Sequence, residues 1–193
     1  TDPTYVEICQ ASLTSRKRRA LKAQAALALT EAWTSPDSET SWRIAQMWRD
    51  AQEKSAFLQA CQQSAQQALD APHSPSYQTA FDRTETMIAI YDEIRAALTS
   101  PGNHAVVHAV DWPSILIFGA ETSLALERDK SFQQYCTRLR QWVNAFSQPI
   151  LLAHIQRLMA RQCLRHENYD RATELAALAR HGFDLCNDEI ESA

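Results

Sequence analysis

Residues 74–98 read SPSYQTAFDRTETMIAIYDEIRAAL, and this stretch decides the fold class. Its apolar side chains recur with a spacing of about 3.6 residues, which is typical of a helix that buries one face. Pro75 favours a helix start, and Pro101 with Gly102 marks the end of the pattern. The stripe consists of Tyr77, Phe81, Thr84, Ile88, Tyr91, Ile94 and Leu98.

The rest of the chain follows the same pattern. Prolines separate long stretches rich in Ala, Leu, Gln, Glu, Arg and Lys, one of which runs from Pro36 to the loop at 72–75. Only three glycines occur in 193 residues, at Gly102, Gly119 and Gly182. Hairpin turns and phosphate-binding loops need glycine, which argues against a sheet and against most nucleotide-binding enzymes. The sequence predicts an all-α fold of five to seven helices, as an antiparallel bundle or a short stack of helical hairpins.

The domain organisation follows from length and composition. A chain with 45% hydrophobic and 22% charged residues resembles an ordinary globular protein, and we expect a single domain over residues 1–193. A subdivision near 99–113 is the alternative. Residues 104–110 are rich in valine, and strand, helix and loop all stay open there. A helix is expected from Pro113, and Gly182 is expected to cap the last helix.

The net charge and the cysteine content indicate which classes of partner and which cellular compartment to expect. The net charge of -4 argues against nucleic acid and anionic membranes as general partners. No apolar run reaches the length of a membrane span. The cysteines are far apart and form no CxxC pair, which predicts buried free thiols and a cytoplasmic location. They are Cys9, Cys61, Cys136, Cys163 and Cys186.

A basic run at 16–19, followed by Lys22, is expected to form a solvated helix face. Contact with phosphates or with an acidic partner is the alternative. The tryptophans are expected to anchor the core or the hairpin contacts, with Trp112 as the exception. Because Trp112 lies beside Asp111 and Pro113 in the atypical segment, we expect it to be exposed and to bind a partner.

Residues 150–182 resemble a tetratricopeptide helix pair. Six residues match the family pattern: Met159, Ala160, Asn168, Tyr169, Ala172 and Ala179. Four depart from it: Gln156 replaces the usual tryptophan, Cys163 a tyrosine, Glu167 the turn glycine and Ala176 an aromatic residue. The resemblance implies an antiparallel hairpin packed through small residues. It covers one hairpin, whereas a tetratricopeptide array needs about three repeats, and no repeat is evident across the chain.

His104 and His108 are four residues apart, and Asp111 follows three residues later. On a helix, this spacing places both imidazoles on one face, where they can bind zinc or iron with the carboxylate. The alternative is that the two histidines, with Asp111 and Trp112, line a loop or contact a partner.

Arg161 and His166 form an Arg-x4-His spacing that resembles the motif of the helical HEPN ribonucleases. This resemblance implies that His166 acts as acid and base, and that Arg161 stabilises charge on the phosphate. Helix capping and surface ion pairing are the alternative explanation of the two residues.

No serine or cysteine nucleophile motif occurs in the chain, whereas long amphipathic stretches are abundant. The leading prediction is therefore a non-enzymatic helical protein–protein interaction module: an adaptor, a chaperone or a regulatory protein. Its partner would be another protein, and it would need no cofactor. A homo-oligomer is left open, as are the ribonuclease and the metal- or ligand-binding alternatives.

Overall fold

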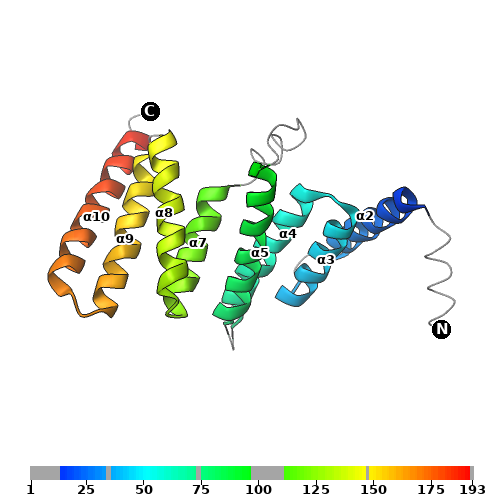
Figure 1. The fold of residues 1–193 in the computed structure, drawn as a ribbon, viewed down its shortest axis with the longest axis horizontal. Coiled ribbons are helices and arrows are strands. Elements are labelled where there is room, and N and C mark those ends of the chain that lie inside the picture. Colours follow the sequence, from blue (N-terminus) through cyan, green and yellow to red (C-terminus); the bar gives the residue numbers. More distant parts are fainter. Residues whose placement is uncertain (1–13, 34–35, 73–74, 97–110, 147, 192–193) are drawn as a thin grey trace. The chain divides into compact units, whose positions relative to one another are not determined.

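The computed structural model describes residues 14–33, 36–72, 75–96, 111–146 and 148–191. Within these ranges the chain forms eight helices and no strand, so the predicted all-α class is confirmed (Figure 1). The helices are α2 (Ser15–Ala32), α3 (Ser38–Ala51), α4 (Lys54–Asp70), α5 (Tyr77–Ala96), α7 (Trp112–Ala125), α8 (Asp129–Phe146), α9 (Pro149–Arg165) and α10 (Tyr169–Glu191).

Eight helices in the described ranges exceed the predicted five to seven. One reason is that the stretch from Pro36 to the loop at 72–75 contains two helices, α3 and α4, which meet at Gln52. The backbone of Gln52 is left-handed, with φ 65°. Neither glycine nor proline marks this break, so the hydrophobic spacing runs through it without a signal.

Three helix connections share one turn geometry. In each, a residue other than glycine has positive φ: Gln52 (65°), Glu127 (57°) and Glu167 (59°). The next residue donates its amide hydrogen to the carbonyl oxygen four positions before this turn residue, as in a Schellman motif. The bonds join Glu53 N to Trp48 O (3.0 Å), Arg128 N to Ser123 O (2.8 Å) and Asn168 N to Cys163 O (2.9 Å). In all three hairpins the second helix therefore begins two residues after the turn residue.

The three hairpins, α3/α4, α7/α8 and α9/α10, also share the register of their buried residues. The residue seven positions before the turn residue is a buried alanine in every case, and the residues five and twelve positions after it are buried as well. These sets are Ala45, Ala120 and Ala160; Phe57, Phe132 and Ala172; and Ser64, Leu139 and Ala179. The structure therefore contains stacked antiparallel helix pairs with a repeat that the sequence did not reveal, because residue types change at equivalent positions.

The chain divides into two compact units, Thr1–Val110 and Asp111–Ala193. In the first unit each helix from α2 to α5 packs on the next one. In the second unit α7 and α8 pack together, α9 contacts both of them, and α10 packs on α9. The single domain over residues 1–193 stays a prediction.

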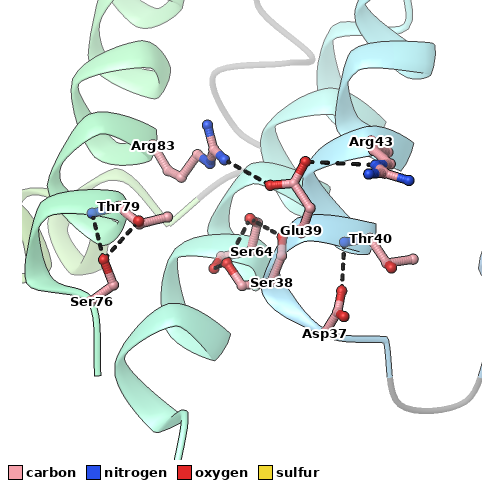
Figure 2. A network of polar contacts seen from close by, with 9 residues as sticks. All are labelled: Asp37, Ser38, Glu39, Thr40, Arg43, Ser64, Ser76, Thr79 and Arg83. Atoms are coloured by element: carbon pink, nitrogen blue, oxygen red, sulfur yellow. Dashed lines mark hydrogen bonds and ion pairs between the residues drawn. The ribbon is translucent and has the colours of Figure 1, made fainter. Parts of the chain in front are cut away.

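Two serines join α3 to α4 in the first unit (Figure 2). Ser38 Oγ donates to the carbonyl oxygen of Ser64 at 2.8 Å, and Ser64 Oγ donates to that of Ser38 at 2.6 Å. Ser64 is fully buried, and this reciprocal pair satisfies its hydroxyl. Beside it, the carboxylate of Asp37 accepts from the Thr40 amide at 2.7 Å and caps α3.

An arginine joins α5 to α3. The Arg83 guanidinium lies 3.7 Å from the Glu39 carboxylate and 3.6 Å from the centre of the Trp42 ring. Its side chain is only 16% exposed, so burial lowers the pKa of Arg83, and the nearby Glu39 carboxylate opposes this shift. Glu39 also pairs with Arg43 at 3.6 Å.

Several finer expectations change. Gly182 does not cap the last helix: it lies within α10, where an added Cβ would be 2.9 Å from the Cβ of Ala153. Trp33 is 48% exposed and anchors no core. The helix expected from Pro113 is confirmed, since α7 begins at Trp112, whereas residues 104–110 lie outside the described part of the chain. Among the described helices, none is long and apolar enough to cross a membrane.

The contribution of the shared turn to stability can be tested by substitution of its left-handed residue. A left-handed residue other than glycine costs about 1 kcal/mol, so Glu167→Gly should raise the free energy of unfolding by up to about 1 kcal/mol, less the entropy that glycine adds to the unfolded chain. Ala177→Gly, at an exposed helical position in α10, should instead lower it by about 1 kcal/mol. Urea denaturation measures both, and equal losses would contradict the role given to the turn.

Candidate functional site

The main candidate site is a groove between α9 and α10. It is open to solvent and has a volume of about 500 Å³. Both helices supply apolar or small side chains and arginines to it. The lining residues are Arg157, Ala160, Arg161, Leu164, Ala172, Thr173, Ala176, Ala179, Arg180, Phe183 and Asp184.

Small side chains give the groove its depth. Ala172 and Ala179 are buried and form part of its floor, and Ala176 is exposed between them on α10. Leu164 is 52% exposed at the α9 side, and the half-buried ring of Phe183 lies on the α10 side. An exposed leucine beside a small-residue floor is a surface that the apolar face of a helix can cover.

The α9 side of the groove is basic. Helix α9 contains three arginines, spaced four residues apart, and no aspartate or glutamate. Arg157 donates to the Glu121 carboxylate of α7 at 2.7 Å, and Arg161 lies 4.0 Å from the same carboxylate. Arg165 donates to Asp129 of α8 at 2.8 Å and to the carbonyl oxygen of Leu124 at 3.1 Å. These contacts hold α9 against the preceding hairpin.

The α10 side carries Arg180, whose guanidinium lies 3.8 Å from the Asp184 carboxylate. The two side chains are 86% and 64% exposed. Exposed pairs of this kind contribute less than about 1 kcal/mol, so Arg180 can exchange this partner for another carboxylate at small cost.

His154 contacts the groove residue Phe183 without lining the groove itself. Its imidazole packs against the Phe183 ring edge to face, with a centroid distance of 4.9 Å. Its Nδ1 atom is buried and has no hydrogen-bond partner among the described residues. Burial lowers the pKa of His154 below 6.5, the Arg157 charge lowers it further, and Glu121 opposes the shift.

The structure brings the residues of the ribonuclease hypothesis to the same region. Arg161 lies on α9 within the groove, and His166 follows α9 as its C-cap residue. Each is next to a carboxylate: Arg161 next to Glu121, and His166 Nε2 at 3.7 Å from Asp129. The His166 side chain is 54% exposed. Their proposed roles in RNA cleavage stay a prediction.

The metal hypothesis rests mainly on His104 and His108, which lie outside the described residues. Asp111 is described and acts as the N-cap of α7, accepting from the Ser114 amide at 3.3 Å. In the described part of the chain, no group of three or more His, Cys, Asp or Glu residues is arranged to hold a metal ion.

The expected exposure of Trp112 is wrong. Its side chain is 1% exposed, because the Asp111 cap makes Trp112 the first residue of α7 and places its ring in the helical packing. Its role in binding stays a prediction. The basic run at 16–19 lies on exposed α2, where Lys22 pairs with Asp50, so the solvated face is confirmed.

The structure describes four of the five cysteines. Cys61 and Cys136 are buried, at equivalent positions of two hairpins, and burial raises the pKa of their thiols to about 12 and about 11. Cys186 is buried and Cys163 is half-buried, and all four thiols are free. The expected buried free thiols are confirmed for three of them, while Cys9 lies outside the described residues.

The groove itself was not predicted from the sequence. One signal for it was available: the absence of acidic residues from α9, whose arginines recur at four-residue spacing. The small residues of α10 were recognised as packing residues of a hairpin. Ala176 is exposed beside Leu164 because of the way α10 crosses α9. The spacing of residues in the sequence does not predict this crossing.

No protein-family model, no curated protein and no solved structure shows a significant match to this chain. The tetratricopeptide resemblance of residues 150–182 is thus supported as far as an antiparallel helix pair within a stack of such pairs, and not as membership of that family.

His154 makes stability depend on pH. Because its pKa is lower in the folded state than in the unfolded state, the unfolded chain binds the proton more readily. Stability should therefore fall as the pH drops through 6.5 toward the folded-state pKa, and stay lower below it.

The measurement is the urea midpoint at pH 7.5 and at pH 5.5. The decrease should be smaller in His154→Gln than in the wild type, whereas His181→Gln, which changes an exposed histidine of α10, should behave as the wild type. The same decrease in all three proteins would refute this assignment.

Proposed function

We propose that this chain is a helical protein–protein interaction module that binds a helix of its partner in the α9/α10 groove. The proposal rests on one observation: this groove occupies, in the last described hairpin, the position at which the preceding hairpin is covered by a helix. Adaptors, chaperones and regulatory proteins all use such surfaces, and the choice among these roles depends on the partner.

Equivalent positions in the two hairpins differ by forty residues, the distance between Glu127 and Glu167. Glu121, Leu124, Gln133 and Arg140 of α7/α8 correspond to Arg161, Leu164, Thr173 and Arg180 of α9/α10. The latter four residues all line the groove.

Helix α9 covers the four α7/α8 positions. Glu121 binds Arg157 at 2.7 Å, and the carbonyl oxygen of Leu124 accepts from Arg165 at 3.1 Å. Gln133 donates to Gln162 at 2.9 Å, and the Arg140 guanidinium contacts the Met159 sulfur at 2.7 Å. A surface that holds a helix in one hairpin is thus open in the next.

The first unit supports the same reasoning. Helix α5, which follows the hairpin α3/α4, packs on α4 and contacts α3 through Arg83. In both units, therefore, the helix after a hairpin contacts both of its helices. The open surface of α9/α10 is equivalent to the surface that a helix covers on α7/α8, which supports a helix as its ligand.

A matched pair of variants tests the proposal. Ala176→Gln places a larger polar side chain in the groove, whereas Ala177→Gln makes the same change at an exposed position of α10 outside it. Both should unfold within about 0.5 kcal/mol of the wild type. Proteins captured from lysate by the wild type and by Ala177→Gln should be lost with Ala176→Gln. An identical set of captured proteins for all three would refute the groove as the binding site.

The ribonuclease alternative has a separate test. It expects RNA cleavage by the purified protein and its loss in His166→Ala, because the imidazole would act as acid and base. Wild-type protein that leaves RNA intact, or cleavage that His166→Ala does not change, would remove this alternative. In neither case does the groove proposal change, since His166 does not line the groove.

A further inference from the structure

One charged helix-binding position is reversed between the filled surface and the open groove, while the other is basic in both, as Arg140 on α7/α8 and Arg180 on α9/α10. On α7/α8 the first helix supplies a carboxylate, Glu121, and the bound helix α9 supplies arginines. In the first unit, likewise, Glu39 of α3 meets Arg83 of the following helix α5. On α9/α10 the position equivalent to Glu121 is Arg161.

The arginines of the open groove therefore favour a helix of the opposite charge to α9. Arg157 and Arg161 lie on its α9 side, with side chains 44% and 53% exposed, and Arg180 lies on its α10 side. Asp184 is the single acidic residue among the described lining residues, and Glu121 of α7, outside the lining, pairs with Arg157 at 2.7 Å and lies 4.0 Å from Arg161. A bound helix with acidic residues beside its apolar stripe would pair with arginines on both sides and cover Leu164.

The same arginines disfavour a second copy of the chain docked through its helix α2. That helix is the most exposed of the first unit, with Leu21 at 51% and Leu27 at 49%, and only Ala26 is buried. It begins with the basic run at 16–19, however, which would bring positive charge to the arginines of the groove.

We propose that the α9/α10 groove binds an acidic amphipathic helix of another protein, with carboxylates that pair with Arg161 and Arg180 on either side of an apolar stripe seated on Leu164. This inference depends on the proposed function, because it specifies the partner of the same groove.

Two peptides test it, based on the helix that fills the equivalent surface. The first is residues 149–165, PILLAHIQRLMARQCLR. The second carries Arg157→Glu, Arg161→Glu and Arg165→Glu and is otherwise identical. Glutamate and arginine have similar helix propensities, so the pair differs mainly in charge. Binding of each labelled peptide to the full chain is measured by fluorescence anisotropy in reducing buffer.

The glutamate peptide should bind about tenfold more tightly than the arginine peptide, as two partly exposed ion pairs allow. The difference should decrease at high salt. In the full chain with Arg161→Glu and Arg180→Glu, the preference should reverse. Leu164→Gln should weaken binding of the glutamate peptide, whereas Leu178→Gln, which changes a 44% exposed leucine outside the groove, should leave it unchanged.

The remaining outcomes separate the two proposals. Equal binding of both peptides, lost in each case with Ala176→Gln, would overturn the acidic partner and leave the groove as a helix-binding site. Absence of binding, or binding that Ala176→Gln does not change, would overturn both. A concentration-dependent dimer in sedimentation that Ala176→Gln dissociates would identify a second copy as the occupant and overturn this inference.

Discussion

The packing of the described hairpins depends on one backbone constraint, the left-handed residue that ends the first helix. Gln52, Glu127 and Glu167 adopt this conformation without being glycine. In each turn the amide of the next residue donates the same hydrogen bond to a carbonyl oxygen of the first helix. Because the turn sets where the second helix begins, it also sets which residues face each other across the pair. The buried alanines Ala45 and Ala120 thus occupy the same place in two hairpins whose sequences differ.

This shared register determines how the next helix packs on a hairpin. A buried alanine lies seven residues before each turn, and the helices that follow α3/α4 and α7/α8 contact both helices of the pair. Long side chains then connect the layers: Arg83 reaches Glu39 in the first unit, and Arg157 reaches Glu121 in the second. Ion pairs with exposed partners contribute little to stability, and their charges affect mainly the specificity of such contacts.

The sequence predicted the helical class for sound physical reasons. The scarcity of glycine limits the backbone conformations, and the apolar spacing near 3.6 residues defines one face of a helix. Both signals depend on residues close together in the sequence, so the sequence alone reveals them. The break at Gln52 was missed because a left-handed turn without glycine has no compositional signal. The exposure of Trp112 was predicted wrongly for a related reason, since the cap at Asp111 places the tryptophan inside helix α7 and not in the loop before it.

The sequence by itself determined which segments are helical, that their faces are amphipathic, and that residues 150–182 form an antiparallel hairpin. Only the tertiary structure decided that Arg161 and Glu121 occupy equivalent positions, and that α9 covers one surface while Leu164 and Ala176 line the next. The reason is that equivalent positions are counted along the chain from the turn residue, and the backbone conformation of the folded hairpins identifies that residue. Side chains at equivalent positions differ in type and charge, so comparison of the residues alone does not align them.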